Sequence, residues 1–144
     1  MRARAIALAG AALLLLSACG DGGGSPTPSP SAPATPDLSS RPSSPAVLSI
    51  TSPTVNATVT GSKLHVVVAL QNARIVQATT TQINPAEGHV HLYLDNQLIY
   101  MGFSLEQDVP VHPGVYTLKA EFVGADHFPF NPRVYSSSIV FQVQ

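Results

Sequence analysis

From residue 47 onward, the sequence consists of short runs in which apolar and polar residues alternate, and this pattern limits the fold more than any other feature. Such alternation places every second side chain on one face of a half-buried β-strand. No segment after Cys19 carries a sustained apolar period of 3.6 residues, so helices are not expected. The sequence therefore predicts an all-β domain over residues 47–144.

Turn residues divide this region into about seven short strands, which is typical of a β-sandwich. Asp95-Asn96 is a tight-turn pair and predicts a hairpin between the runs HVHLYLD and QLIYM. The pattern favours an immunoglobulin-like antiparallel β-sandwich, with a small barrel as the competing shape. The clearest runs are residues 47–51, 64–70, 89–95, 97–101, 115–123 and 135–143, and weaker ones are 55–60, 73–80 and 103–109.

The segment His112-Pro113-Gly114-Val115-Tyr116 supports the sandwich. A Pro-Gly turn followed by a tyrosine at a strand start resembles the tyrosine corner of immunoglobulin-like domains, in which the hydroxyl bonds the backbone upstream. The chain has no tryptophan and only one cysteine, so the cysteine pair and core tryptophan of antibody domains are absent. The likeness is therefore to the wider immunoglobulin-like class.

The first residues have the composition of an export signal. Two arginines in MRARA precede an apolar run from Ile6 to Leu16, which is shorter than the roughly 20 residues that a membrane span needs. The following block, LSAC, resembles the lipobox of bacterial lipoprotein precursors. That resemblance implies removal of residues 1–18 and attachment of lipid to Cys19. The alternative is an ordinary secretory signal with an incidental cysteine.

Residues 19–46 are predicted to form a disordered tether that begins at the lipidated cysteine. Proline, serine and glycine dominate this segment, and its only large apolar residue is Leu38. Such a chain cannot bury enough apolar surface to offset the entropy of ordering it. We expect a spacer that holds the domain away from the membrane. A proline-rich ligand for a partner and a glycosylated stalk are the alternatives.

The pair His89 and His91 is the main chemical signal in the domain. On a strand, residues i and i+2 share a face, so both imidazoles should point away from the core residues Val90 and Leu92. In an immunoglobulin-like sheet, the strand that starts at Val115 lies antiparallel beside this one. The loop after that strand, residues 124–132, should therefore return to the same end of the sheet.

This loop carries Asp126 and His127. One interpretation is a copper or zinc site formed by His89, His91 and His127, with Asp126 as a ligand or as a group that orients a ligand. The other is that these side chains bond one another and backbone carbonyls, and so hold an irregular loop in place. Met101, on the adjacent hairpin strand, is either a soft copper ligand or a packing residue.

The same region resembles an uncharacterised group of bacterial periplasmic domains. The shared pattern is a Gly-His-x-His strand, a Pro-Gly turn and an Asp-His loop that ends in proline. It is matched by Gly88, His89, His91, Pro113, Gly114, Asp126, His127 and Pro132. This chain has Val90 and Phe130 where members of that group often have histidine. The resemblance implies an immunoglobulin-like fold and a place outside the cytoplasm, and it implies no activity.

The sequence contains no catalytic triad, carboxylate pair, phosphate loop or CxxC motif, so an enzyme is not expected. A formal net charge of −1 and scattered basic residues argue against nucleic acid as a partner. The leading hypothesis is a lipid-anchored extracytoplasmic protein whose small domain binds an envelope protein or glycan, without a cofactor. The alternative is a periplasmic copper- or zinc-binding protein.

Overall fold

The computed structural model describes residues 37–144, and the signal segment, Cys19 and residues 20–36 lie outside this range. The described chain contains one short 3₁₀ helix, η1 (Leu38–Ser40), and no helix that is long and apolar enough to cross a membrane. Its strands are β1 (Val47–Ser52), β2 (Thr58–Val59), β3 (Lys63–Gln71), β4 (Arg74–Ile75), β5 (Glu87–Leu94), β6 (Gln97–Gly102), β7 (Glu106–Pro110), β8 (Gly114–Gly124), β9 (Pro129–Tyr135) and β10 (Ile139–Val143).

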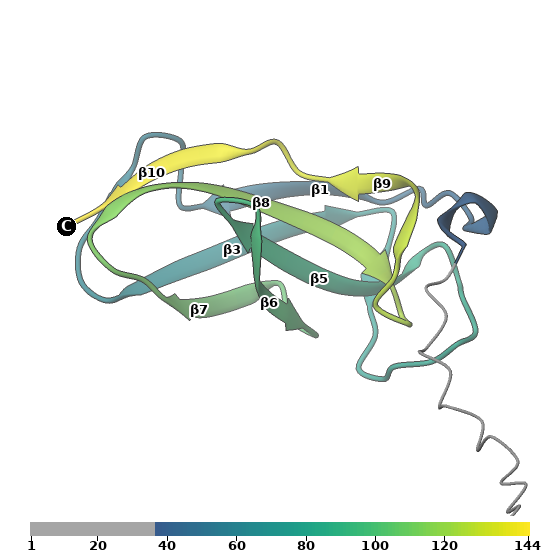
Figure 1. The fold of residues 1–144 in the computed structure, drawn as a ribbon. Helices are drawn as coiled ribbons and strands as arrows, with labels where there is room; N and C mark the ends of the chain where they lie inside the picture. Colours follow the sequence, from purple (N-terminus) through teal and green to yellow (C-terminus); the bar gives the residue numbers. More distant parts are fainter. Residues whose placement is uncertain (1–36) are drawn as a thin grey trace, which may run out of the picture. The chain divides into compact units, whose positions relative to one another are not determined.

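The strands form two sheets that face each other (Figure 1). The smaller sheet has the order β1-β3-β7, and the larger has the order β2-β10-β8-β5-β4, with β6 paired to β5 and β9 paired to β8. Strands β1, β3 and β7 take the places of strands A, B and E of an immunoglobulin-like sandwich, and β5, β8 and β10 take those of C, F and G. The predicted fold class is confirmed.

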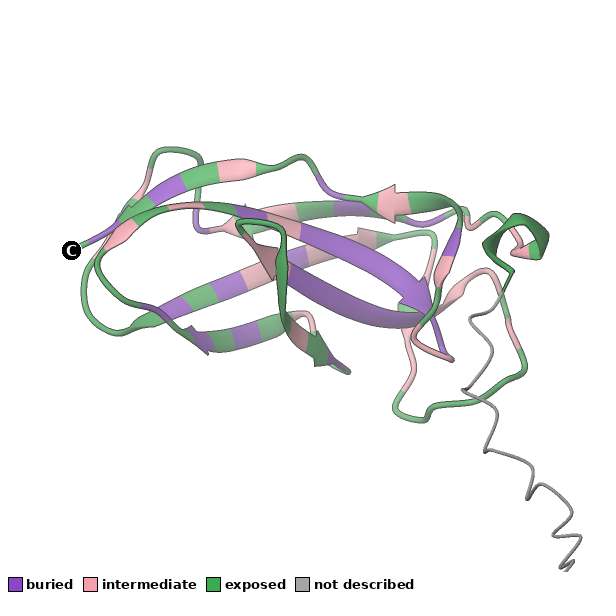
Figure 2. Cartoon of the chain, viewed as in Figure 1, coloured by how far each residue is buried: buried purple, intermediate pink, exposed green. Residues whose placement is uncertain are grey.

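Alternating side chains from both sheets fill the space between them. Leu64, Val66 and Val68 of β3 are buried against the apolar positions of β5, β8 and β10. The alternation is visible as coloured bands along β3 and β7, whereas the central strands β5 and β8 are buried over most of their described length (Figure 2). Because both faces of β5 are buried, the histidines on its outer face are shielded from solvent.

Two local predictions from the turns are confirmed. Asp95 and Asn96 connect β5 and β6 with positive φ angles of 49° and 67°, as a tight hairpin turn requires. The Tyr116 hydroxyl donates to the backbone carbonyl of His112 at 3.0 Å, which is the bond expected of a tyrosine corner.

The strand boundaries differ from the prediction in the region predicted to be an irregular loop. Residues 129–135 form β9, which pairs with β8, and the predicted last strand begins only at Ile139. Proline is tolerated in β9 because this strand pairs on one side only within the described chain. The buried ring of Phe130 packs on Phe122, with 5.7 Å between ring centroids, and this contact holds β9 against the sandwich.

The weaker strand candidates are also shorter than expected. In the predicted strand 55–60 only Thr58–Val59 pairs with a neighbouring strand, and in 73–80 only Arg74–Ile75 does. The strand predicted to begin at residue 103 begins at Glu106. With the two-residue strands included, the described chain has ten strands instead of about seven.

The ordered domain also begins before the predicted boundary at residue 47. Ala46 is buried in the core, and the backbone N–H of Asn131 donates to the carbonyl of Pro42 at 3.0 Å. Arg41 bonds the segment 126–129, as described below. The end of the predicted tether is therefore part of the folded domain. Its composition is poor in apolar residues, but the Arg41 side chain and the Pro42 carbonyl bond it to the domain.

Candidate functional site

The histidine pair lies on the outer face of β5, opposite the core. Val90 and Leu92 are fully buried between the sheets, and His89 and His91 point the other way, as the alternation predicts. The outer face is covered here, since His89 is 0% exposed and His91 only 5% exposed. Burial of an imidazole requires partners for its nitrogens, so its surroundings decide its chemistry.

His127 completes a cluster of three imidazoles. Strand β8 pairs antiparallel with β5, with His89 opposite Val123, so the turn after β8 returns to the histidine end of the sheet, as predicted. His127 occupies this turn with a positive φ of 64°. Its ring lies 4.2 Å from that of His89 and 5.6 Å from that of His91, measured between centroids.

The polar contacts within the cluster are unequal. His91 Nε2 and His127 Nδ1 share a hydrogen bond at 3.3 Å, and His127 Nε2 lies 3.2 Å from the Thr79 hydroxyl. Both ring nitrogens of His89, by contrast, are buried without a hydrogen-bond partner. The backbone of Val76 and Ala78 lies close enough to the His89 ring to raise its pKa, although neither contact has the geometry of a hydrogen bond.

Burial keeps two of the imidazoles neutral at neutral pH. It lowers the pKa of His91 from 6.5 to about 4, with further contributions from His127 and His89. Burial likewise lowers the pKa of His89, again helped by His127. Neutral imidazole is the form that donates a lone pair to a metal ion or accepts a hydrogen bond.

Asp126 lies next to this cluster but is engaged elsewhere. Its two carboxylate oxygens accept hydrogen bonds from the Arg41 guanidinium at 2.6 and 2.9 Å, and one of them also accepts the backbone N–H of Phe128 at 3.2 Å. The carboxylate therefore forms no hydrogen bond with the histidines. The prediction could not include Arg41, because that residue was assigned to the tether.

A buried ionic group that the sequence analysis missed lies beside His91. Glu121 pairs with His91 across the sheet and is 0% exposed. Its carboxylate accepts bonds from Arg133 at 2.6 and 2.8 Å and from the Tyr93 hydroxyl at 2.7 Å. Burial, together with this bond, raises the pKa of Tyr93. The register of β5 and β8 was the available signal, since it places position 121 on the face of the histidines.

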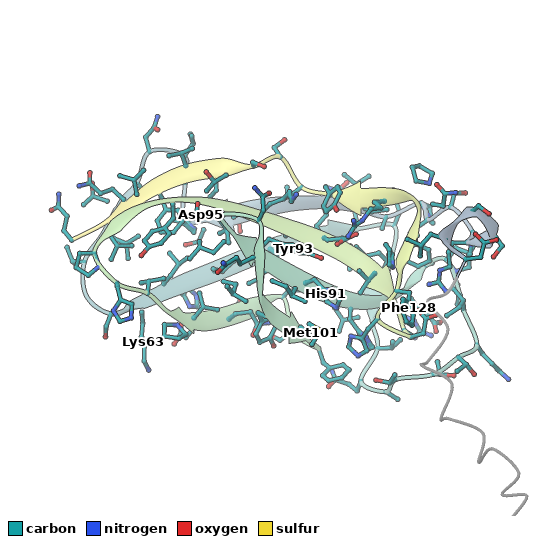
Figure 3. The ribbon with its side chains drawn as sticks, viewed as in Figure 1. Lys63, His91, Tyr93, Asp95, Met101 and Phe128 are labelled. Atoms are coloured by element: carbon teal, nitrogen blue, oxygen red, sulfur yellow. The ribbon has the colours of Figure 1, made fainter. Side chains whose placement is uncertain are left out.

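The other two histidines and Met101 lie apart from the cluster or contact solvent. His65 pairs with Asp108 at 2.8 Å on the smaller sheet, and His112 precedes β8 at the opposite end from the cluster. Met101 is the cross-strand partner of His91 and is 57% exposed, and Figure 3 shows both residues on neighbouring strands. Within residues 37–144, no three His, Cys, Asp or Glu side chains are grouped closely enough to hold one metal ion as they stand.

Gly88 explains why glycine precedes the histidine strand. A Cβ atom at this position would lie 1.9 Å from the carbonyl oxygen of Val123 on β8. The absence of a side chain lets the two strands approach where His89 enters the cluster.

No protein-family model and no curated protein matches the sequence. A solved structure of fibronectin(III)-like modules of Clostridium thermocellum CbhA is 18% identical and covers 67% of this chain and 94% of its own, with a TM-score of 0.49. A solved engineered protein is 15% identical over 69% of this chain and 20% of its own, with a TM-score of 0.42. The strand order described above therefore remains the basis for the fold.

Proposed function

We propose that this protein is a lipoprotein of the bacterial envelope, anchored outside the cytoplasm through Cys19, and that its immunoglobulin-like domain binds an envelope protein. The proposal assigns no catalytic role to the domain. The address rests on the export signal and the LSAC block. The observation that supports binding is an exposed apolar surface on the folded domain.

This surface, the β6 patch, is formed by Leu98, Ile99, Met101 and Phe103. Their exposed fractions are 45%, 38%, 57% and 37%. In the described chain β6 pairs with β5 alone, so the other edge of β6 has free backbone groups. An open hollow of about 530 Å³, lined by Leu70, Ile75, Phe103 and Leu105 among others, adjoins it. A free strand edge beside apolar side chains is a surface on which an extended protein segment can add a strand.

A photo-crosslinking residue at Leu98 tests the binding proposal in cells that make the protein. The matched control is the same residue at Val55, which is 63% exposed and lies near β2, at the opposite edge of the larger sheet. We expect a discrete protein adduct at position 98, lost on Ile99→Asp, and none at position 55. Equal adducts at both positions, or none at either, would contradict the proposal.

The anchor has a separate test. Labelled fatty acid should enter the wild-type chain but not Cys19→Ser, and the variant should leave the membrane fraction. If the intact chain stays in the cytosol with its leader attached, the proposed extracytoplasmic location is wrong, whatever the crosslinking shows.

A further inference from the structure

His91 and His127 place two ring nitrogens at the separation that a metal ion requires. Their Nε2 and Nδ1 atoms lie 3.3 Å apart. Two nitrogens bound to one tetrahedral zinc ion at about 2.0–2.1 Å are about 3.3–3.4 Å from each other. A shared hydrogen bond explains the same distance in the metal-free protein, so the pair alone does not decide between the two roles.

His89 supplies the independent observation. Its ring is fully buried against His127, and neither of its nitrogens has a partner. Leaving a buried polar group unsatisfied is costly, and most such groups in folded proteins are bonded. Apart from the nearby backbone of Val76 and Ala78, the His89 ring meets no polar partner, and it packs on His127, so its lone pair is available for the same ion.

The surroundings provide no free oxygen ligand. The charge of Asp126 favours positive charge at His89, and the charge of Glu121 does so at His91, where Arg133 opposes it. Their carboxylate oxygens are engaged by Arg41 and Arg133, so neither is free to bind an ion in this arrangement. A donor set made only of imidazoles suits zinc or copper and does not suit magnesium or calcium.

We propose that His89, His91 and His127 form a three-nitrogen site for a zinc or copper ion. His91 and His127 are the preformed pair, and His89 becomes the third ligand when its ring turns, since the three do not meet at one point without movement. The proton shared between His91 and His127 moves to the other nitrogen of its own ring. Both facing lone pairs are then free, and no net proton is released. This site adjoins the proposed binding surface on β6, because the Phe103 ring lies 4.5 Å from the His89 ring between centroids, but the metal proposal does not rest on that surface.

Isothermal titration of the full chain in detergent tests the site, with Cys19→Ser in every sample so that the only thiol cannot bind the ion. After chelator treatment and its removal, Zn²⁺ and Cu²⁺ are titrated separately. We expect one ion per chain with micromolar or tighter affinity for at least one of the two. The ion that binds more tightly identifies the metal.

The matched variants assign the ligands. His127→Ala changes a partly exposed turn residue and should weaken binding at least 100-fold, and His89→Gln should weaken it at least 10-fold. His112→Ala, an exposed histidine at the other end of β8, should have no effect. Imidazole ¹⁵N chemical shifts should move for the three ligands and not for His65 or His112, which reports on coordination even if a variant is unstable.

Several results would overturn the site. Binding weaker than about 100 μM for both ions, or undiminished binding in His127→Ala, would mean adventitious metal only. Undiminished binding in His89→Gln would refute the three-histidine set.

Discussion

His91 pairs with Glu121 across the sheet, bonds His127 and is 5% exposed. In water a histidine side chain titrates near neutral pH, and the neighbours and the burial of His91 both change its pKa. Burial has the largest effect and favours the neutral ring, so protonation of His91 and folding oppose each other.

The metal-free protein should therefore lose stability in mild acid. The pKa of His91 is 6.5 when unfolded and about 4 when folded, so between these values the unfolded chain binds the extra proton. The free energy of unfolding should be constant above pH 7 and fall by up to about 2–3 kcal/mol between pH 6.5 and 4. Urea unfolding with chelator present measures this. His91→Gln should flatten the slope and His112→Ala should not, and equal slopes in all three proteins would refute the cause.

Gly88 is the second residue whose surroundings decide its identity. Gly88→Ala would place a methyl group 1.9 Å from the Val123 carbonyl oxygen, so the strands must separate. We expect urea unfolding to show that the free energy of unfolding falls by about 1–3 kcal/mol, the usual cost of overpacking. Gly114→Ala, whose methyl would meet the Tyr116 ring at 3.3 Å, is the matched control and should cost less. If Gly88→Ala lowers the free energy of unfolding no more than Gly114→Ala does, the close approach of β5 and β8 at Gly88 is not required for stability.

At the scale of elements, β5, β8 and β9 carry a buried ionic group on the face that a simple sandwich leaves to solvent. Glu121 on β8 is bonded by Tyr93 of β5 and Arg133 of β9. Lys119 lies over the Tyr135 ring at 4.3 Å from its centroid, and thereby extends the contact between β8 and β9. These interactions hold a proline-containing strand that has little propensity of its own.

Removing Arg133 should show how much free energy is needed to keep the Glu121 carboxylate buried without a cation beside it. Arg133→Met leaves the buried Glu121 carboxylate without its cationic partner and with only the Tyr93 hydroxyl bonded to it, which should destabilise the fold by about 3–5 kcal/mol. Urea unfolding at neutral pH measures the loss. The double variant Arg133→Met/Glu121→Leu should recover most of the loss, and failure to recover would locate the cost elsewhere.

At the scale of the whole molecule, the chain before β1 closes onto the histidine end of the sandwich. Arg41 donates to the carbonyls of Pro129 and Phe128 at 3.0 and 3.1 Å, in addition to its bonds with Asp126. The side chains of Arg41 and Asp126 are 10% and 15% exposed, so this ion pair is largely shielded from solvent. The segment that leads into the domain is thus joined to the turn that carries His127.

Arg41→Gln should therefore destabilise the domain by about 1–3 kcal/mol, because Asp126 loses its partner in a shielded position. Arg74→Gln is the matched control. Arg74 pairs with Glu87, but its side chain is 74% exposed, so this change should stay within about 0.5 kcal/mol. Thermal and urea unfolding compare the two. Similar losses in both variants would show that the segment before β1 is not coupled to the fold.

The sequence by itself determined the features that depend on local pattern. Alternation placed the β-domain and most of its strands, the Asp95-Asn96 pair set the hairpin, and the sequence around Tyr116 identified the corner. Because a sandwich of this class has a fixed strand order, the approach of His127 to His89 and His91 also followed from the sequence.

Only the tertiary structure decided the partners of each charged group. Arg41 binds Asp126 across 85 positions of sequence, and the buried Glu121 is bonded by Arg133 of β9, a strand whose first residues were predicted to lie in a loop. No local pattern encodes either contact. An ion pair forms wherever the folded chain brings opposite charges together and excludes water, and that depends on packing rather than on the period of the side chains.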